Sequence, residues 1–515
     1  MEHTEVLIVG AGPTGLVLAL HLARQGIGFR IIDRNSGPGQ DSRAMVLQAR
    51  TLEFYQFLGL AEEVVHSGII VRGLYLWKDR QKIAEFPFGH FGEGISPYAF
   101  ALSFPQDDHE KLLLRHLQRA GADVEWNTEL TDFAVQEGGV VAQFATPNGG
   151  NNVRAAFLSG CDGARGTVRQ RLGVEFPGGT YEQTFFVADV RASGPPLNGD
   201  VNICLGPDTF YAVFPVRSSG TFRLIGTIPS GLGEEASFDD VRPSVEKQLD
   251  ARLESCQWYS RYRVHHRVAQ HFQRTPVFLC GDAAHLHSPA GGQGMNTGIG
   301  DAVNLAWKLA DVARGRARPS LLETYELERR RFALGLVKST DRAFEGAVGK
   351  SLLPRLFRSV AAPHLLPTLL HVDPVRRAMF RLVSQIRINY RTSPLSDGRA
   401  GDVRGGDRLP WTGENFRPLG SADWQVHVYG ATSPTVRDAI AACRLPLHQF
   451  GWNRAAEEAG LAQDALYLVR PDGHVALADP SPSPERLQEF LERFDLRVAM
   501  EQPPEPVDQS VRYQG

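Results

Sequence analysis

The sequence predicts an α/β protein of more than one domain, and three features of the chain indicate this fold class. An apolar, β-branched run at Val6–Val9 leads directly into a glycine-rich turn and a helical segment, as expected for a strand buried in a parallel sheet. Residues 181–275 alternate apolar and polar side chains, which predicts a sheet with one exposed or ligand-facing side. Further strands and helices follow residue 401, and 515 residues are enough for two or three domains.

The segment from Glu5 to Asp33 carries the most specific pattern in the chain. Gly10, Gly12 and Gly15 form a GxGxxG turn between a strand and a helix. The first glycine permits the sharp turn, the second lets a pyrophosphate approach the backbone, and the third lets helix and strand pack closely. The phosphates would lie at the helix N-terminus, where unpaired N–H groups and the helix dipole favour an anion. The pattern predicts a Rossmann-like dinucleotide-binding domain but does not separate FAD from NAD.

Several residues around this turn are expected to contact the same dinucleotide. Asp33 follows the second predicted strand, where its carboxylate can accept hydrogen bonds from a ribose. Arg34, Pro13 and Thr14 are its neighbours in the same site. Arg43 has two interpretations, a cation on the pyrophosphate or a solvated arginine at a helix start.

Composition excludes several classes of function. The formal net charge of −3 gives no indication of a nucleic-acid or anionic-membrane partner. The chain contains no apolar run long enough to span a bilayer and no signal-peptide profile, so we expect a cytoplasmic protein. The five cysteines lie far apart without metal-ligand spacing, so we expect reduced thiols and no structural metal: Cys161, Cys204, Cys256, Cys280 and Cys443.

A second constellation, at residues 277–310, favours a flavin. An apolar strand ends at Gly281–Asp282, a loop with several glycines follows, and a helix begins near Met295–Asn296. Asp282 is placed to bond the hydroxyls of a sugar or ribityl chain. The loop would let a flat ring lie against backbone, and the helix N-terminus would favour negative charge on that ring. A reduced flavin is such an anion, whereas a simple nicotinamide is not.

Three motifs in order, GAGPTG, CDGARGTVR and GDAAHLHSPAGGQGMNTGIGDAVNLAWKL, resemble those of the FAD-dependent aromatic hydroxylases, the single-component flavoprotein monooxygenases. The resemblance covers about residues 4–345. It implies that Asp282 contacts the ribityl chain and that the loop from Pro289 through Gly294, Met295 and Asn296 lines the flavin ring. One departure is Gly166, where members often have serine.

The resemblance implies roles for other residues as well. Asp33 and Arg43 would hold the adenosine and pyrophosphate. Gln106 would face FAD, although an ordinary loop amide is the alternative interpretation. Asp162 would lie where FAD and a transient NADH or NADPH both pass.

Candidate substrate residues come from two segments. Tyr211, Phe214 and Pro215 lie on the alternating sheet, and His90 and Tyr98 come from an aromatic-rich inserted segment at about 71–104. The alternative is that these aromatic residues are ordinary core. For His285 and His287 we favour packed or loop-anchoring roles over catalytic ones.

The expected domain organisation follows from these patterns. The FAD-binding domain has a first part at 1–180 and a second part at 276–345, and the substrate-binding sheet occupies 181–275. A helical linker is expected at 346–400, and a flexible tail at 501–515. Residues 401–500 resemble the thioredoxin-like domain that some of these hydroxylases carry; only Cys443 lies there, so we expect a structural or oligomer-forming role rather than thiol chemistry.

The predicted function is an FAD-dependent monooxygenase that uses NADH or NADPH and molecular oxygen to hydroxylate a phenolic or polycyclic aromatic through a flavin hydroperoxide. This mechanism requires no dedicated nucleophile, and no catalytic residue is assigned. Two alternatives remain open at this stage: a flavin-binding protein that sequesters an aromatic ligand, and an NAD(P)-dependent dehydrogenase. A homo-oligomer is also left open.

Overall fold

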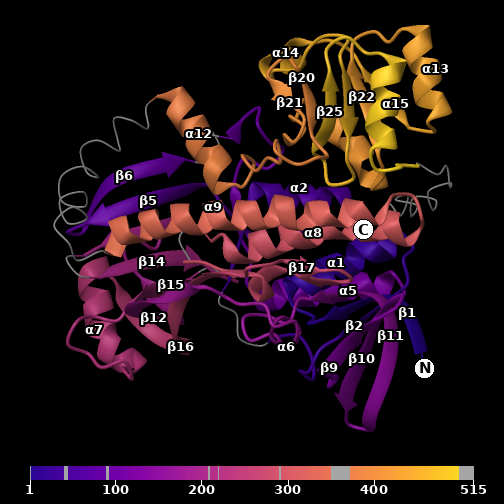
Figure 1. The fold of residues 1–515 in the computed structure, drawn as a ribbon. Coiled ribbons are helices and arrows are strands. Elements are labelled where there is room, and N and C mark those ends of the chain that lie inside the picture. Colours follow the sequence, from indigo (N-terminus) through magenta and orange to yellow (C-terminus); the bar gives the residue numbers. More distant parts are fainter. Residues whose placement is uncertain are drawn as a thin grey trace, which may run out of the picture. The chain divides into compact units, whose positions relative to one another are not determined.

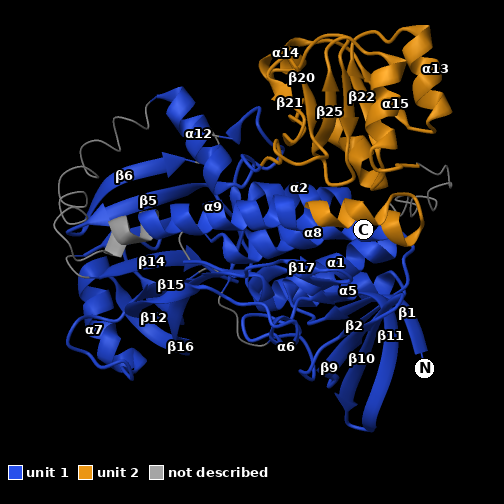
Figure 2. Cartoon of the chain, viewed as in Figure 1, with its two compact units in different colours: residues 1–310, 325–388 blue, residues 311–324, 389–515 orange. Residues whose placement is uncertain are grey.

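The computed structural model describes residues 2–39, 44–87, 92–206, 209–217, 220–288, 292–348 and 372–497. The chain forms two compact units, shown in Figure 2. The first comprises residues 1–310 and 325–388, and the second comprises residues 311–324 and 389–515. The longer segment of the second unit begins at residue 389, within the segment expected to be a linker. The expected tail at 501–515 lies outside the described residues.

The first unit contains a largely parallel sheet that includes β1, β2 and β11 (Figure 1). Its strands lie in the order β18, β11, β1, β2, β8, and every neighbouring pair among them is parallel. Their bounds are β1 (Glu2–Val9), β2 (Phe29–Ile32), β8 (Val124–Glu125), β11 (Gly149–Gly160) and β18 (Val277–Leu279). Three antiparallel strands complete it: β9 (Glu129–Gln136), β10 (Gly139–Thr146) and β17 (Gln273–Arg274).

Helices accompany this sheet. Helix α1 (Pro13–Arg24) follows β1 directly and buries an almost continuous set of apolar residues, because it packs against both the sheet and α5 (Gln106–Arg119). Helices α8 (Gly294–Ala313) and α9 (Glu323–Val348) are joined by a buried ion pair, in which Lys308 Nζ lies 2.9 Å from Glu328 Oε2. The shorter helices of this unit are α2 (Ala49–Phe57), α3 (Ala61–Ser67), α6 (Thr167–Arg171) and the 3-10 turn η1 (Gly281–Ala283).

The expected substrate sheet is a second eight-stranded sheet in the order β19, β16, β12, β15, β14, β13, β5, β6. Strands from the inserted segment join it through a parallel pairing of β5 with β13, so the insert and the strands within residues 178–268 build one sheet. The bounds are β5 (Gly73–Lys78), β6 (Gln81–Pro87), β12 (Gly178–Ser193), β13 (Val201–Leu205), β14 (Phe210–Pro215), β15 (Thr221–Thr227), β16 (Arg252–Val268) and β19 (His285–Leu286).

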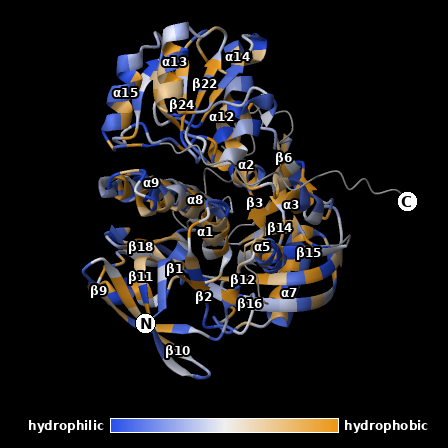
Figure 3. Cartoon of the chain, turned by 90° about the vertical axis from the view of Figure 1, so that its right-hand side faces the viewer, coloured by the Kyte–Doolittle hydropathy of each residue, from blue (hydrophilic) through white to orange (hydrophobic). Residues whose placement is uncertain are grey.

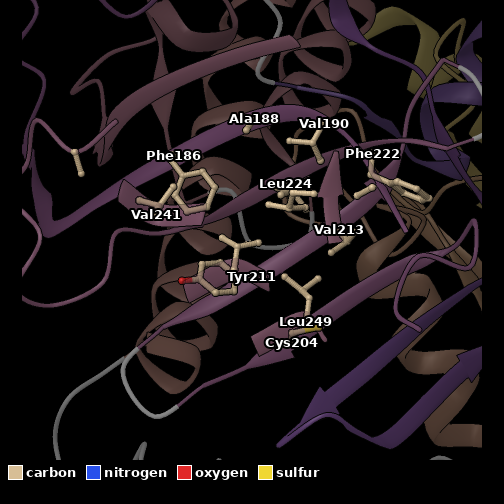
Figure 4. Close-up of a cluster of buried hydrophobic side chains, with 14 residues drawn as sticks. Phe186, Ala188, Val190, Cys204, Tyr211, Val213, Phe222, Leu224, Val241 and Leu249 are labelled. Atoms are coloured by element: carbon tan, nitrogen blue, oxygen red, sulfur yellow. The ribbon is translucent and has the colours of Figure 1, made fainter. Parts of the chain in front are cut away.

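One face of this sheet is covered by α7 (Phe238–Leu249), and Figure 4 shows the buried cluster between them. The unit also contains α12 (Asp373–Val383) and a small sheet of β3 (Val46–Leu47), β7 (Ala101–Ser103) and β4 (Ile69–Val71). Figure 3 shows that most elements carry both hydrophobic and hydrophilic residues, as expected when each element buries one side.

The second unit contains a six-stranded sheet in the order β21, β20, β25, β24, β22, β23. Strand β22 pairs in parallel with β23 and antiparallel with β24, so the sheet is mixed. Its elements are β20 (Asp397–Ala400), β21 (Val403–Arg404), β22 (Gln425–Tyr429), β23 (Leu447–Phe450), β24 (Leu466–Val469), β25 (Val475–Asp479), α13 (Pro434–Ala442), α14 (Arg454–Glu458), α15 (Pro484–Glu492), η2 (Pro319–Leu322) and η4 (Glu414–Ser421). The thioredoxin-like assignment of this unit remains a proposal.

Candidate functional site

Four of the loops singled out in the sequence leave the same edge of the parallel sheet. The GxGxxG turn follows β1, Asp33 follows β2, Asp162 follows β11 and Asp282 follows β18. Backbone bonds hold these strand ends together: Gly10 N donates to Ile32 O at 2.8 Å, and Cys161 N donates to Val9 O at 2.7 Å. Because parallel strands end at one edge, segments about 270 positions apart in the chain form one site.

Glycine occupies positions 10, 12 and 15, in the GxGxxG turn, for different reasons. Gly10 has a φ of 103°, and a Cβ there would lie 2.4 Å from Cys161 O. A Cβ at Gly15 would lie 1.9 Å from Gly10 O, so both positions require glycine for the fold itself. Gly12 has an ordinary φ of −72°, and a Cβ there would have no described atom within 4 Å. The open space in front of Gly12, at the N-terminus of α1, fits a pyrophosphate that approaches the backbone.

Asp33 fixes the turn after β1, in addition to the ribose contact predicted for it. Its Oδ2 accepts from Ala11 N at 2.8 Å, and its Oδ1 accepts from Asn35 N at 2.8 Å. A carboxylate has about four acceptor positions, so two remain for ribose hydroxyls. Its neighbour Arg34 is exposed in the loop that follows.

The two carboxylate oxygens of Asp162 differ in their hydrogen bonding. Oδ2 accepts from Val168 N at 2.9 Å, whereas the buried Oδ1 has no hydrogen-bond partner among the described residues. Burial raises the pKa of this carboxyl, and the bond from Val168 opposes that shift. A Cβ at Gly166 would lie 2.2 Å from Asp162 Oδ1. Glycine in place of the more usual serine therefore leaves room for the carboxylate.

The early and late motifs meet at Thr14. A Cβ at Gly281 would lie 2.7 Å from Thr14 Oγ1, and a Cβ at Gly298 would lie 2.5 Å from the same atom. These two glycines let α8 and the loop after β18 pack closely on the start of α1. Asp282, the next residue, is exposed at this junction.

A buried carboxylate, Asp301, anchors the loop that carries Asp282. Its Oδ2 accepts from Gly281 N at 2.9 Å and lies 2.7 Å from His285 Nε2, and its Oδ1 accepts from Arg329 Nε at 2.6 Å. Burial alone would raise the pKa of Asp301, but the charges of Arg329 and His285 outweigh it and the pKa is lowered. This geometry agrees with a loop-anchoring role for His285.

His287 lies on the same loop. Its Nδ1 is 2.9 Å from Ser288 O, which requires Nδ1 to carry the proton. Burial lowers its pKa to about 4, with a further contribution from His285. The ring is therefore neutral near neutral pH.

Asn296 joins the start of α8 to the β3–α2 segment. Its Oδ1 accepts from Gln48 N at 2.9 Å and Thr51 Oγ1 at 2.7 Å, and its Nδ2 donates to Val46 O and Gly292 O at 2.8 Å each. The side chain is fully used by the protein, so it can offer a ring only its main chain. Gly294 and Met295 beside it are half-buried.

Gln106 holds a loop rather than projecting freely. Its Nε2 donates to Glu110 Oε1 at 2.8 Å, and Glu110 Oε2 accepts from Gly39 N at 2.9 Å. Burial raises the pKa of Glu110. Gln106 therefore supports the loop after Asp33, and direct contact of its side chain with FAD remains a prediction. Three other predicted site residues, Arg43, His90 and Pro289, lie outside the described residues.

The structure separates the substrate candidates of β14. Tyr211 is fully buried between the sheet and α7, where its hydroxyl lies 2.8 Å from Ser244 Oγ (Figure 4). Phe214 packs with Val46 and Leu74 in a different cluster. Pro215 contributes its carbonyl to a bond from Ser103 Oγ at 2.6 Å. Tyr211 is thus a core residue, and only Phe214 of the three has its side chain in the cluster that adjoins the loop at Gly292.

Tyr98 lies in an apolar cluster that includes Phe86, Phe380 and Leu74. Leu74 also belongs to the cluster of Phe214, so the two clusters are contiguous. The Phe214 cluster reaches the loop before α8 through Val46, because a Cβ at Gly292 would lie 3.1 Å from Val46 Cβ. A continuous apolar region therefore extends from the expected ring loop to Tyr98.

The comparisons with known proteins agree with this arrangement. Residues 3–340, more than half of the chain, match the family described as FAD binding domain. The 6-methylpretetramide 4-monooxygenase of Streptomyces rimosus is 36% identical over 416 residues, covering 78% of this chain and 73% of that protein. The chain belongs to the FAD-dependent aromatic monooxygenases.

Two further relatives of this monooxygenase support the assignment. The pentachlorophenol 4-monooxygenase of Sphingobium chlorophenolicum is 31% identical over 79% of this chain and 75% of its own. The solved structure of the anhydrotetracycline hydroxylase OxyS from Streptomyces rimosus superposes with a TM-score of 0.77 at 28% identity, covering 96% of this chain and 100% of that one.

FAD is therefore the cofactor of this monooxygenase, and a dehydrogenase that uses the first motif alone is excluded as its function. Within the described ranges no helix is both long and apolar enough to cross a membrane. Among the same residues no cluster of His, Cys, Asp or Glu could hold a metal ion.

Sequence reasoning missed several supporting residues of the monooxygenase site. Asp301, Arg329 and Gln385 hold the loops; Asp301 lies within the late motif but was given no role, and Arg329 and Gln385 lie outside the motifs. One signal was available: Asp301, Asn304 and Lys308 are polar residues spaced by three and four on an otherwise apolar helix, and all three are buried.

Proposed function

We propose that this monooxygenase hydroxylates a polycyclic phenol, with molecular oxygen as co-substrate and NADH or NADPH as the transient reductant. The observation that carries the proposal is the continuous apolar region between the loop at Gly292 and Tyr98, which has Phe214 and Phe380 along it. Such a region suits an extended aromatic ligand. Relatives named for tetracycline-type substrates and for pentachlorophenol support aromatic alcohols as the class.

Bound FAD supplies the redox chemistry, accepting reducing equivalents from the nicotinamide and activating oxygen for transfer to the aromatic ring. The protein's own contribution is binding and positioning. The backbone around Gly12 receives the pyrophosphate, Asp33 and Asp282 accept from hydroxyls, and the backbone of residues 294–296 faces the ring. The apolar walls exclude water and hold the aromatic within reach.

A group of cations near Asp162 supports docking of the reductant there. The pKa of His265 is lowered by burial and then by the positive charges of Arg267, Arg165 and Arg263. Besides burial, the positive charge of Arg267 also contributes to lowering the pKa of Arg169. The Nη1 atom of Arg169 donates a hydrogen bond to Ala283 O at 2.9 Å. These positive charges would attract the phosphates of a nicotinamide dinucleotide to this part of the site.

The purified protein decides between the proposed hydroxylase and a flavoprotein that only sequesters an aromatic. Oxidation of NADH and NADPH should be followed with and without anhydrotetracycline and pentachlorophenol. Yellow protein whose oxidation of reductant is accelerated by a phenol, with a hydroxylated product, supports the proposal. Yellow protein that no reductant bleaches would favour sequestration.

Asp282→Ala tests the assignment of the ribityl contact. Loss of hydrogen bonds to a charged group costs about 1.5–3 kcal/mol, so FAD affinity should fall about tenfold or more. The measurement is flavin content after dialysis of dilute protein. Asp438→Ala, which removes an exposed carboxylate on α13, is the matched control and should retain FAD. Unchanged flavin content in Asp282→Ala would remove this residue from the site.

A further inference from the structure

Gln385 has an unusual backbone for its position. Its φ is 62°, in the left-handed region that residues with a Cβ rarely adopt, yet only 5% of the residue is exposed. A buried residue keeps such a conformation when its surroundings hold it there. The contacts of its side chain show what those surroundings are.

The side-chain amide of Gln385 holds the start of α8 and the residue just before it. Its Nε2 lies 2.5 Å from Gln293 Oε1 and 3.0 Å from Thr297 Oγ1. The amide of Gln293 in turn donates from Nε2 to Val383 O at 2.9 Å. We call these hydrogen bonds of Gln385 and Gln293 the clasp. The end of α12 and the loop that precedes α8 are thus joined by side chains of both segments.

The same turn contributes side chains to the apolar region. Phe380 and Ile386 are buried in the cluster that contains Tyr98. A Cβ at Gly92 would lie 2.6 Å from Phe380 Cζ, so this ring packs tightly on the inserted segment. Ile386 directly follows Gln385, and Phe380 lies five positions before it, so both members of the apolar cluster are close in sequence to the amide that holds Gln293.

We propose that Gln385 is a positioning residue through which an aromatic bound beside Phe380 sets the conformation of the loop at the flavin ring. The inference rests on the proposed function, which places the substrate in that apolar region. A ligand shifts an equilibrium only by its different affinity for two states, and contact with Phe380 and Ile386 supplies that difference at α12. The clasp between Gln385 and Gln293 carries the shift to residues 293–297.

Two variants separate the amide from the backbone. Gln385→Ala removes the amide and keeps the left-handed strain, whereas Gln385→Gly removes the amide and relieves the strain. Both should lose the clasp, and the glycine variant is expected to fold at least as well as the alanine variant. Arg444→Gly, which relieves the same backbone conformation at an exposed position with a φ of 55°, is the control.

The first readout needs no substrate: quenching of flavin fluorescence by iodide in each holoenzyme. Greater quenching in both Gln385 variants, with wild-type quenching in the control, supports the proposal. The second readout is the ratio of anaerobic flavin reduction rates by NADPH with and without anhydrotetracycline. Where this phenol accelerates the wild type, the ratio should fall about fivefold or more in both variants.

Wild-type quenching in both Gln385 variants would overturn the proposal. Altered quenching in Gln385→Ala alone would also overturn it, because backbone strain rather than the amide would then be the cause. Absence of flavin from the purified wild type would instead refute the proposed function on which the inference rests. The two failures are therefore distinguishable.

Discussion

At the scale of single residues, the glycines of the turn after β1 separate folding from binding. Gly10 and Gly15 are required by the fold, since a Cβ at either would collide with main-chain oxygen. The fold does not require glycine at position 12, because the φ of Gly12 is ordinary and no described atom is near the position of a Cβ. A glycine without a structural reason in the protein is best explained by a ligand that approaches its backbone.

Gly12→Val should therefore abolish FAD binding while the apoprotein stays folded. The measurement is the flavin absorbance of the purified variant together with its circular dichroism. Gly233→Val is a matched control, because it too has an ordinary φ and open space around it, in an exposed loop. Full flavin occupancy in Gly12→Val would mean that the phosphates lie elsewhere.

A buried histidine, His109, makes stability depend on pH. It is fully buried with Nε2 2.7 Å from the Tyr55 hydroxyl, and burial lowers its pKa from 6.5 to about 3. The unfolded chain takes up a proton first as pH falls. The stability that the fold gains from keeping His109 neutral is thus fully present above pH 6.5, the pKa of histidine in the unfolded chain. It is lost as pH falls toward 3, the pKa in the folded protein.

At about pH 5, protonation of His109 in the unfolded chain should lower the free energy of unfolding by about 2 kcal/mol relative to neutral pH. His109→Gln removes the titrating group, so the difference between urea unfolding at about pH 7 and about pH 5 should shrink by that amount. His66→Gln, at an exposed position, should keep the wild-type difference. An unchanged difference in His109→Gln would show that His109 does not titrate on unfolding.

At the scale of elements, the site depends on how loops are anchored at the strand ends. Asp301 on α8 holds Gly281 N, His285 and Arg329, which belongs to α9. The carboxylate thereby fixes the loop of Asp282 relative to two helices. Removing its charge would break the ion pair between Asp301 and the buried Arg329 guanidinium.

Asp301→Asn should lower the free energy of unfolding by about 3 kcal/mol, because breaking a buried pair leaves an uncompensated charge. FAD affinity should fall with it, since the loop of Asp282 loses its anchor. Adding Arg329→Met should restore part of the stability by removing that charge. Chemical unfolding and flavin retention measure both effects, and wild-type stability of Asp301→Asn would contradict the anchoring role.

The sequence predicts some parts of the site and not others, for physical reasons. The strand-end loops could be predicted because each motif follows an apolar run, and parallel strands end at one edge. Tyr211 and Phe214 differ by three positions, so a strand must place them on opposite faces. Which face α7 covers is decided by helix docking, and docking leaves no local pattern. The clasp of Gln385 likewise depends on contacts between distant segments.

At the scale of the whole molecule, the family assignment rests on the first unit, whereas the role of the second unit is a proposal. The first carries the FAD motifs and the apolar region, and its resemblance to the flavoprotein monooxygenases is confirmed by the family match over residues 3–340. The second contains a mixed sheet and a single cysteine, Cys443, whose pKa is raised by burial. A single thiol of raised pKa cannot form a redox pair, which favours the structural role proposed for this unit.

The most direct test of the proposed hydroxylation is the origin of the oxygen in the product. The holoenzyme should be supplied with NADH or NADPH and a panel of phenols that includes anhydrotetracycline and pentachlorophenol, under oxygen-18 gas. We predict that at least one phenol accelerates oxidation of the reductant and yields a product that contains one oxygen-18 atom from the gas. Oxidation of reductant that yields only hydrogen peroxide, with no labelled product from any phenol of the panel, would contradict the proposed function.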